Sequence, residues 1–295
     1  MDTKLRKQKL EIIRTKLGFD NMFAVDYVGK SGGLAFFWEE GWEVEVQNYS
    51  HRHINAIVHD QNLSVDWKLT GFYGHPDPTK RHEAWALLKL LARLTPDPWI
   101  CIGDFNEVLT MLEKVGGNAR KRHLMEAFRQ MLEVCGLTDL GYIGPKFTWT
   151  NCQDGNSFIK EKLDRGFCNM AWRNFFPKSQ IYVEAAISSD HTPLLLYLEG
   201  SRVKARQRTR FHYDACWASD KGCQETIKSS WLQETLPIMN WDTFSAKLAA
   251  CVENMQIWRR EKNKNAQGSI SKLQKRLLSL QTRGGVSDVA AIKKL

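Results

Sequence analysis

The first two thirds of this 295-residue chain are predicted to form a mixed α/β domain. Two observations carry this prediction. Short apolar segments that end in glycines or polar turns recur along residues 1–199, which is typical of strands that pair locally. Amphipathic helical segments lie between some of them, so the strands are expected to form mixed sheets covered by helices.

The expected elements begin with a basic amphipathic helix at residues 4–17. Helices are also expected at residues 83–94 and 124–135, separated by a buried strand that starts at Trp99, and strand-like segments recur as far as Leu198. The strands expected between the first two helices lie at residues 22–27, 34–38, 43–49, 54–59 and 65–73.

Positive charge is concentrated in the last third of the chain. Residues 1–199 contain 24 Lys or Arg and 25 Asp or Glu, whereas residues 200–295 contain 18 and 8. Residues 200–210 are expected to be a solvated basic linker, and residues 211–295 have the periodicity of a helical extension. Because Lys and Arg neutralise phosphates, the tail is expected to bind DNA, and RNA is a further candidate ligand. The linker side chains expected to do so are Arg202, Lys204, Arg206, Arg208 and Arg210.

The composition argues against several classes of protein. Seven cysteines without a C-x-x-C pair argue against a disulfide framework and a zinc site, and suit a reducing compartment. The first residues show no secretory signal, and no stretch approaches the roughly 20 apolar residues of a membrane span. We therefore expect an intracellular protein without membrane contact, rather than a secreted enzyme.

Two polar motifs beside apolar runs carry the candidate chemistry. Asp104 and Asn106 come directly after a buried strand-like run, and Asp190 and His191 come just before another. Carboxylates can hold a divalent cation, an amide can orient a phosphate or water, and an imidazole can move a proton. Taken singly, each motif also fits an ordinary turn or a surface histidine. Together they predict metal-assisted phosphodiester hydrolysis.

Further motifs follow in an order that resembles the endonuclease/exonuclease/phosphatase superfamily, which includes DNase I and the apurinic/apyrimidinic endonucleases. They lie at residues 70–76, 147–151 and 162–165. Within that superfamily, the runs at residues 31–35, 74–76, 81–85 and 147–151 look like the endonuclease domain of plant LINE-type (non-LTR) retrotransposon polyproteins. The resemblance implies a DNase I-like four-layer α/β sandwich, in which helices flank two packed mixed sheets. It also implies that residues 211–295 connect to a reverse transcriptase, which is absent here, and that a functional protein would act in the nucleus.

The resemblance also assigns roles to single residues. It implies that Asp104 polarises the attacking water or lies beside the metal, that Asn106 contacts the scissile phosphate, and that Asp190 lies near an Mg²⁺ or Mn²⁺ ion. His191 would transfer a proton or bind phosphate and would be held by Asp164. Which residue is the general base stays open.

The same resemblance places further residues near the substrate. Tyr73 would hydrogen-bond the phosphate, although a half-buried strand aromatic is the alternative. Thr148, Trp149 and Ser189 would lie close to the DNA backbone, although an aromatic strand is more often core. The remaining histidines are interpreted as surface or turn residues: His51, His53, His59, His75, His82, His123 and His212.

The beginning of the chain departs from the family pattern. Family members begin with a strand bearing an asparagine, and a second strand then ends in a metal-binding glutamate of a Glu-Thr-Lys-like motif. Residues 1–4, Met-Asp-Thr-Lys, align with that motif, so Asp2 is expected to replace the glutamate as a metal ligand. The first strand with its asparagine and most of the second strand would then be missing, through truncation or a mis-predicted start, and activity would be impaired. A catalytically inactive remnant that binds nucleic acid, and a phosphatase acting on a small phosphoester, are the alternative functions.

Overall fold

The computed structural model divides the chain into two compact units. One comprises Met1–Arg202 together with Leu277–Leu295, and the other comprises Val203–Arg276. The structure describes residues 3, 5–28, 31–61, 63, 65–93, 98–186, 189–199, 213, 215–232 and 241–283.

A six-stranded mixed sheet forms the centre of the first unit, in the order β3-β4-β5-β6-β11-β8. Only β5 and β6 pair in parallel, and the other neighbours are antiparallel. The strands are β3 (Glu43–Ser50), β4 (His53–Asp60), β5 (Val65–Tyr73), β6 (Trp99–Asp104), β8 (Thr138–Asp139) and β11 (Asp164–Cys168). Strand β6 is apolar almost throughout because both of its faces are covered.

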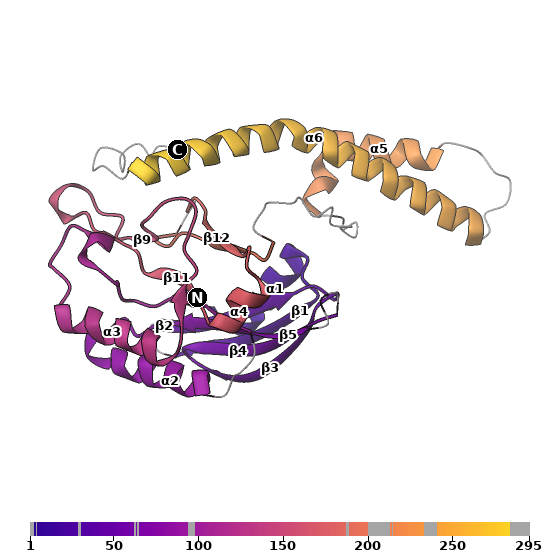
Figure 1. Ribbon diagram of the computed structural model, residues 1–295. Coiled ribbons are helices and arrows are strands. Elements are labelled where there is room, and N and C mark those ends of the chain that lie inside the picture. The colour runs from indigo at the N-terminus through magenta and orange to yellow at the C-terminus, as the bar shows by residue number, and fades with distance from the viewer. Residues whose placement is uncertain are drawn as a thin grey trace. The chain divides into compact units, whose positions relative to one another are not determined.

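Two helices cover one face of this sheet, α2 (Arg81–Arg93) and α3 (Arg122–Val134) (Figure 1). Their apolar sides bury Leu88 and Phe128 against Phe72, Phe105 and Phe167 of the sheet and its loops. The Phe128 and Phe167 rings meet edge to face, with centroids 5.8 Å apart. This packing supports the sheet from behind and leaves its opposite face for a second layer of strands.

The second layer consists of two antiparallel pairs in the part of the chain that the structure describes. The pairs are β1 (Asn21–Val28) with β2 (Ser31–Trp38), and β12 (Gln180–Val183) with β13 (Leu194–Tyr197). Leu34 of β2 packs on Ile54 and Tyr73, whereas Ile181 of β12 packs in a separate cluster of the same face. The predicted α/β class, with packed sheets flanked by helices, is confirmed.

An apolar groove of about 250 Å³ lies between these two pairs. Phe36 of β2 and Leu194 of β13 stand at its sides, and Leu69 and Ile102 of the central sheet form its floor. Among the described residues, the second layer is therefore interrupted over the middle of the central sheet.

Smaller elements surround these layers. A three-stranded sheet has the order β7-β10-β9, and Asn169 caps α4 by accepting a hydrogen bond from the Trp172 backbone N–H at 2.9 Å. The bounds are α1 (Lys7–Leu17), β7 (Lys114–Val115), β9 (Trp149–Thr150), β10 (Lys160–Glu161) and α4 (Met170–Phe175). Short 3₁₀ turns lie at Pro78–Lys80, Met111–Glu113, Gly155–Ser157 and Ala215–Ser219.

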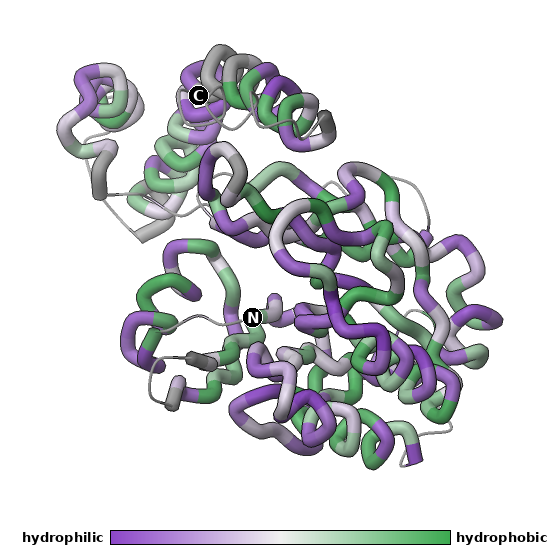
Figure 2. Tube along the Cα trace, turned by 90° about the vertical axis from the view of Figure 1, so that its left-hand side faces the viewer, coloured by the Kyte–Doolittle hydropathy of each residue, from purple (hydrophilic) through white to green (hydrophobic). Residues whose placement is uncertain are grey.

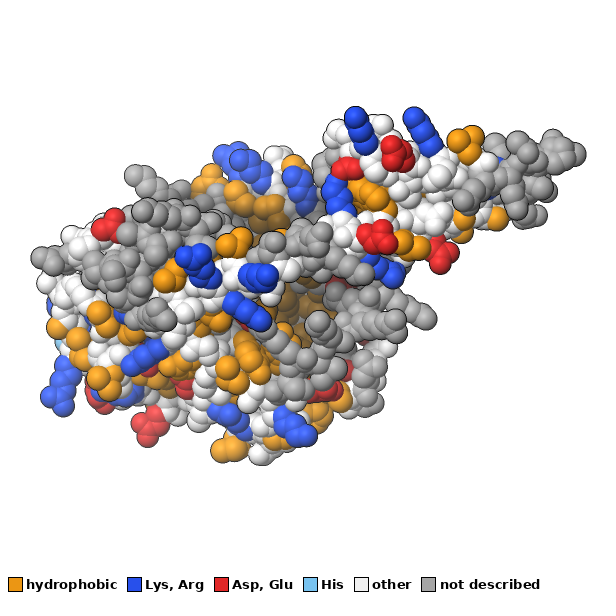
Figure 3. Space-filling view, turned by 90° about the horizontal axis from the view of Figure 1, so that it is seen from above, with side chains coloured by type: hydrophobic (Ala, Val, Ile, Leu, Met, Phe, Trp, Pro, Cys, Tyr) orange, Lys and Arg blue, Asp and Glu red, His pale blue; other side chains and the backbone are white. Residues whose placement is uncertain are grey.

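The second unit is helical. Helix α5 (Lys221–Leu232) packs against α6 (Trp241–Arg283) through a small apolar cluster of Cys223, Cys251 and Met255. Figure 2 shows polar and apolar residues alternating along the helices, and none of the described helices is long and apolar enough to cross a membrane. On the face in Figure 3, the described Lys and Arg side chains lie in small groups between apolar ones.

Candidate active site

Three predicted site residues lie in one row across the central sheet. Asp104 ends β6 and is directly opposite Asp164, the first residue of the antiparallel neighbour β11. Tyr73 ends β5 and is the parallel partner of Asp104. Cross-strand partners project from the same face, so the ends of three strands bring these side chains together. Asp104 and Asp164 are almost completely buried, at 2% and 1% exposure.

A tight turn after β6 fixes the Asn106 carboxamide. The backbone of Gly103 has φ 150°, and a Cβ there would lie 2.1 Å from the Phe72 carbonyl oxygen, so only glycine fits. Asp104 accepts from the Asn106 backbone N–H at 2.8 Å and from Asn106 Nδ2 at 2.9 Å. Asn106 Nδ2 also donates to the Gly74 carbonyl at 3.0 Å, which settles the direction in which the carboxamide points.

His191 is held by a buried carboxylate. Its Nδ1 lies 2.9 Å from Asp164 Oδ2, while Asp164 Oδ1 is buried without a hydrogen-bond partner among the described residues. Burial lowers the pKa of His191, but the hydrogen bond and charge of Asp164 outweigh burial and raise that pKa from 6.5 to about 9. His191 is therefore an imidazolium at neutral pH, able to donate a proton or bind an anionic oxygen.

Asp104 has the opposite character. Burial, followed by the charge of nearby Asp164, raises the pKa of Asp104 from 3.8 to about 7. A carboxyl group whose pKa is near neutrality can exchange a proton at working pH, as a general base must. The two aspartates and His191 thus form a site in which one group is ready to accept a proton and another to donate one.

Three predicted DNA-contacting residues, Thr148, Trp149 and Ser189, make hydrogen bonds within the protein around Asp164 and His191. Thr148 is fully buried, and its Oγ1 accepts from the backbone N–H of Asp164 at 2.8 Å, so this hydroxyl faces the protein. Trp149 Nε1 donates to Asp190 Oδ2 at 3.1 Å, and Ser189 Oγ accepts from the His191 backbone N–H at 3.1 Å. Trp149 is half-buried, and Ser189 and Asp190 are exposed. Any role of theirs on DNA stays a prediction.

Only part of the predicted cation site lies among the described residues. Of the two predicted ligands, Asp190 is described, and its side chain offers carboxylate oxygens, the ligand type that Mg²⁺ prefers. Asp2 lies outside the described residues, and within those residues no group of three or more His, Cys, Asp or Glu side chains is placed to hold a metal ion. The donor chemistry fits Mg²⁺, but the described residues give an incomplete set. The five predicted linker residues, Arg202, Lys204, Arg206, Arg208 and Arg210, also lie outside the description.

Sequence reasoning missed Arg52, which lies beside the site. Its Cζ is 5.9 Å from the centroid of the Tyr73 ring, and its Nη1 is 3.5 Å from the Gly74 carbonyl that Asn106 also contacts. Arg52 occupies the turn between β3 and β4, and the pairing of β4 with β5 brings that turn to Tyr73. A lone arginine in a hairpin turn gives no signal in the sequence.

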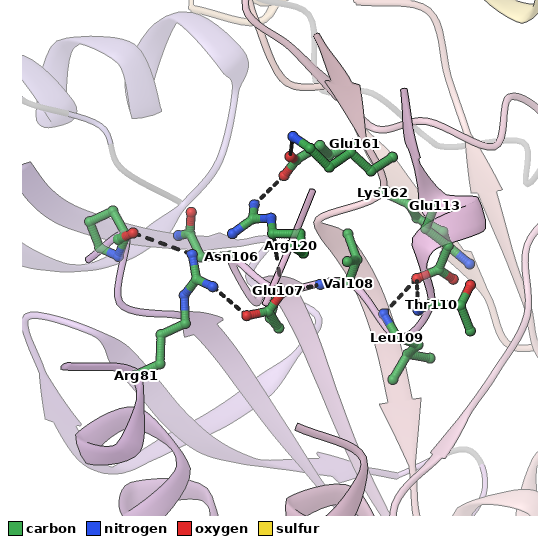
Figure 4. Close-up of polar contacts among 12 residues, drawn as sticks. Arg81, Asn106, Glu107, Val108, Leu109, Thr110, Glu113, Arg120, Glu161 and Lys162 are labelled. Carbon is green, nitrogen blue, oxygen red and sulfur yellow. Dashed lines mark hydrogen bonds and ion pairs between the residues drawn. The ribbon is translucent and has the colours of Figure 1, made fainter. Parts of the chain in front are cut away.

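A buried ionic network, also missed, runs behind the site (Figure 4). Arg81 pairs with Glu107, the residue after Asn106, and Arg120 lies 4.0 Å from the other Glu107 oxygen. Arg120 and Lys114 both bind Glu161. The sequence motif around residue 104 indicated the turn, but nothing in the sequence paired its glutamate with an arginine 26 residues earlier.

The interpretation of His53 as a surface or turn residue is wrong. His53 begins β4, is 4% exposed, and lies between Ser50 Oγ at 2.8 Å and Asn48 Oδ1 at 2.9 Å. Burial, with smaller effects from His51 and Lys68, lowers its pKa to about 4. The hairpin encloses the ring, which is therefore neutral and structural.

Residues 5–191 match the family described as the Endonuclease/Exonuclease/phosphatase family. A search of curated proteins found no match. Among solved structures, the chain is similar to the endonuclease domain of TRAS1, a telomere-specific non-LTR retrotransposon, with 17% identity, 60% of this chain and 78% of that chain covered, and a TM-score of 0.49.

Two further solved structures are similar to a comparable extent. The 3′ phosphatase NExo from Neisseria, bound to a product DNA hairpin, has 15% identity, a TM-score of 0.49, and 65% and 84% coverage of this chain and its own. Beta toxin from Staphylococcus aureus has 14% identity, a TM-score of 0.45, and 66% and 84% coverage. The family match alone spans more than half of the 295 residues, and the chain therefore belongs to the endonuclease/exonuclease/phosphatase family.

Proposed function

We propose that residues 1–199 form an Mg²⁺-dependent endonuclease domain of LINE retrotransposon type that nicks DNA. The observation that carries this proposal is the row of Asp104 and Asp164 with His191 held 2.9 Å from Asp164. Membership of the family supports phosphoester hydrolysis in general. The DNA substrate and the LINE type rest on the motifs of the sequence.

The residues divide the work of hydrolysis between them. Asp104, with its pKa near 7, removes a proton from the attacking water as the water oxygen bonds to phosphorus. Asn106 orients the phosphate through its fixed carboxamide. The bond from phosphorus to the 3′ oxygen breaks, and the His191 imidazolium gives its proton to that oxygen. The products are a 3′-hydroxyl and a 5′-phosphate.

A bound Mg²⁺ ion would neutralise charge on the phosphate oxygens. Asp190 is exposed beside His191 and would contribute a carboxylate oxygen. Arg52 is placed to attract a backbone phosphate at the Tyr73 edge of the site. The basic linker at residues 200–210 would add affinity that does not depend on DNA sequence.

A second candidate is an inactive remnant that only binds nucleic acid. One observation favours it: the apolar groove beside Phe36 and Leu194 separates the two described strand pairs of the second layer close to Gly103, the residue before Asp104. A site with less support from that layer would lose the positional accuracy on which such catalysis depends.

Nicking of supercoiled plasmid DNA, followed by end analysis, tests the proposal. We expect Mg²⁺-dependent conversion to open circles, loss of nicking in EDTA, and nicks that a DNA polymerase extends without prior end repair. The Asp164→Asn variant should nick far more slowly. Binding without nicking would favour the remnant. Hydrolysis of a small phosphomonoester without nicking would replace the endonuclease by a phosphatase.

A further inference from the structure

Two loops meet behind the candidate site, and their spacing sets the position of Asn106. One follows β5 at residues 74–77, and the other follows β6 at residues 105–109. The Gly74 backbone N–H donates to the Asp104 carbonyl at 2.6 Å, and a Cβ on Gly74 would lie 2.3 Å from the Phe105 carbonyl oxygen. Because Asn106 Nδ2 donates across this junction to the Gly74 carbonyl, a shift of either loop moves the carboxamide.

Arg81 binds both loops with one guanidinium group. It is the first residue of α2 and is 3% exposed. Its Nε donates to the His75 carbonyl at 3.2 Å and its Nη2 to the Pro76 carbonyl at 3.4 Å, both in the first loop. Its Nη1 pairs with Glu107 in the second loop (Figure 4).

Glu107 links the Arg81 guanidinium to the loop that carries Asn106. It is fully buried and follows Asn106 directly in the chain. Its Oε1 accepts from the Val108 backbone N–H at 3.0 Å, so the carboxylate is tied to its own loop as well as to Arg81. The planar guanidinium therefore sets the distance between the two loops within one residue of Asn106.

Stability alone does not explain a buried pair at this place. Replacing a buried ion pair by apolar side chains of similar volume is often neutral or stabilising. Apolar side chains, however, cannot bind the two carbonyl groups of the first loop and connect them to the second. A lysine would carry the charge but lacks the fork of donors that reaches three acceptors.

We propose that Arg81, acting through Glu107, is a positioning residue that holds the Asn106 carboxamide in its working orientation. The role of Asn106 on phosphate rests on the proposed function. The position of the carboxamide does not, and it can be measured without activity.

Four variants separate positioning from general structural support. Arg81→Met breaks the pair, and Arg81→Lys keeps the charge. The double variant Arg81→Met/Glu107→Leu removes both charges together. Lys114→Met is the matched control, because Lys114 belongs to the same buried network through Glu161 and Arg120, but its ion pair is with Glu161 and not with Glu107. Each full-length variant is examined by urea unfolding, by NMR of the Asn106 side-chain amide, and by nicking rates over a range of DNA concentrations.

We expect Arg81→Met to shift the Asn106 amide signals and to lower kcat by about 10²-fold with little change in KM, since a misplacement of about 1 Å has that effect. The double variant should regain the urea midpoint but not kcat, Arg81→Lys should be intermediate, and Lys114→Met should leave both Asn106 signals and kcat unchanged. Recovery of kcat in the double variant, or unchanged Asn106 signals in Arg81→Met, would overturn the proposal. If the wild-type chain does not nick DNA, the proposed function fails, and the NMR comparison still decides the role of Arg81.

Discussion

Asp104 should make the folded protein less stable at alkaline pH than an asparagine would. Burial and the charge of Asp164 raise its pKa from 3.8 to about 7. An acid whose pKa is higher in the folded than in the unfolded protein destabilises the native state as the pH rises from the lower of these two pKa values to the higher. About three pKa units correspond to a penalty of roughly 4 kcal/mol above pH 8, and to almost none at pH 4.

Asp104→Asn removes that charge at a small cost in hydrogen bonding. The carboxylate accepts from the backbone N–H and from Nδ2 of Asn106 through its two oxygens. An amide offers one acceptor oxygen, so one of these bonds is lost, which costs about 1 kcal/mol. We therefore expect the variant to be roughly 3 kcal/mol more stable than wild type above pH 8, and equal or slightly less stable near pH 4.

Urea unfolding in EDTA at pH 4 and pH 8.5, followed by tryptophan fluorescence, measures the difference. Asp190→Asn is the matched control, because Asp190 is exposed and its replacement should show no such gain. An Asp104→Asn variant that is less stable than wild type at pH 8.5, or whose advantage does not change with pH, would refute the reasoning. The variant should also lose nicking activity, since its amide cannot accept a proton from water.

Three further predictions concern His191, the β6 turn and the tail. Asp164→Asn should lower the pKa of His191 from about 9 to 6.5 or below in an NMR titration. The variant should therefore be less stable than wild type by the full amount below pH 6.5, and this difference in stability should disappear above pH 9. Gly103→Ala should lower Tm strongly in a thermal scan, because its Cβ would lie 2.1 Å from a backbone oxygen, whereas Gly41→Ala, with open space around it, should not. Removing residues 200–295 should abolish most salt-sensitive DNA binding in a titration at several salt concentrations; an unchanged salt slope would contradict this.

The strands and helices of the first unit follow closely from local sequence patterns. The expected strand at residues 65–73 matches β5 (Val65–Tyr73) in full, and the helix expected at 83–94 is α2 (Arg81–Arg93). The aromatic motif at residues 147–151 forms a strand, β9, only at Trp149 and Thr150, which pair with β10. Periodicity indicates an element, but pairing partners set its length.

The site was less accessible from the sequence. That Asp104 ends a strand could be predicted from the apolar run before it. Its position opposite Asp164 depends on the antiparallel register of β6 and β11, and only the resemblance to a family brought the two together. The Arg81–Glu107 pair, and Arg52 beside Tyr73, depend on contacts between segments that are distant in the chain, for which a single sequence carries no signal.

The imidazolium of His191, bound by Asp164, is expected to serve phosphodiester hydrolysis. Single-turnover nicking of plasmid DNA in Mg²⁺, by the wild-type chain and by His191→Ala and His82→Ala, tests it most directly, because His82 is exposed on α2 and outside the site. We predict that His82→Ala nicks at the wild-type rate and that His191→Ala is slower by about 10²- to 10⁴-fold. Equal rates for the two variants, or no nicking by the wild-type chain, would contradict the claim.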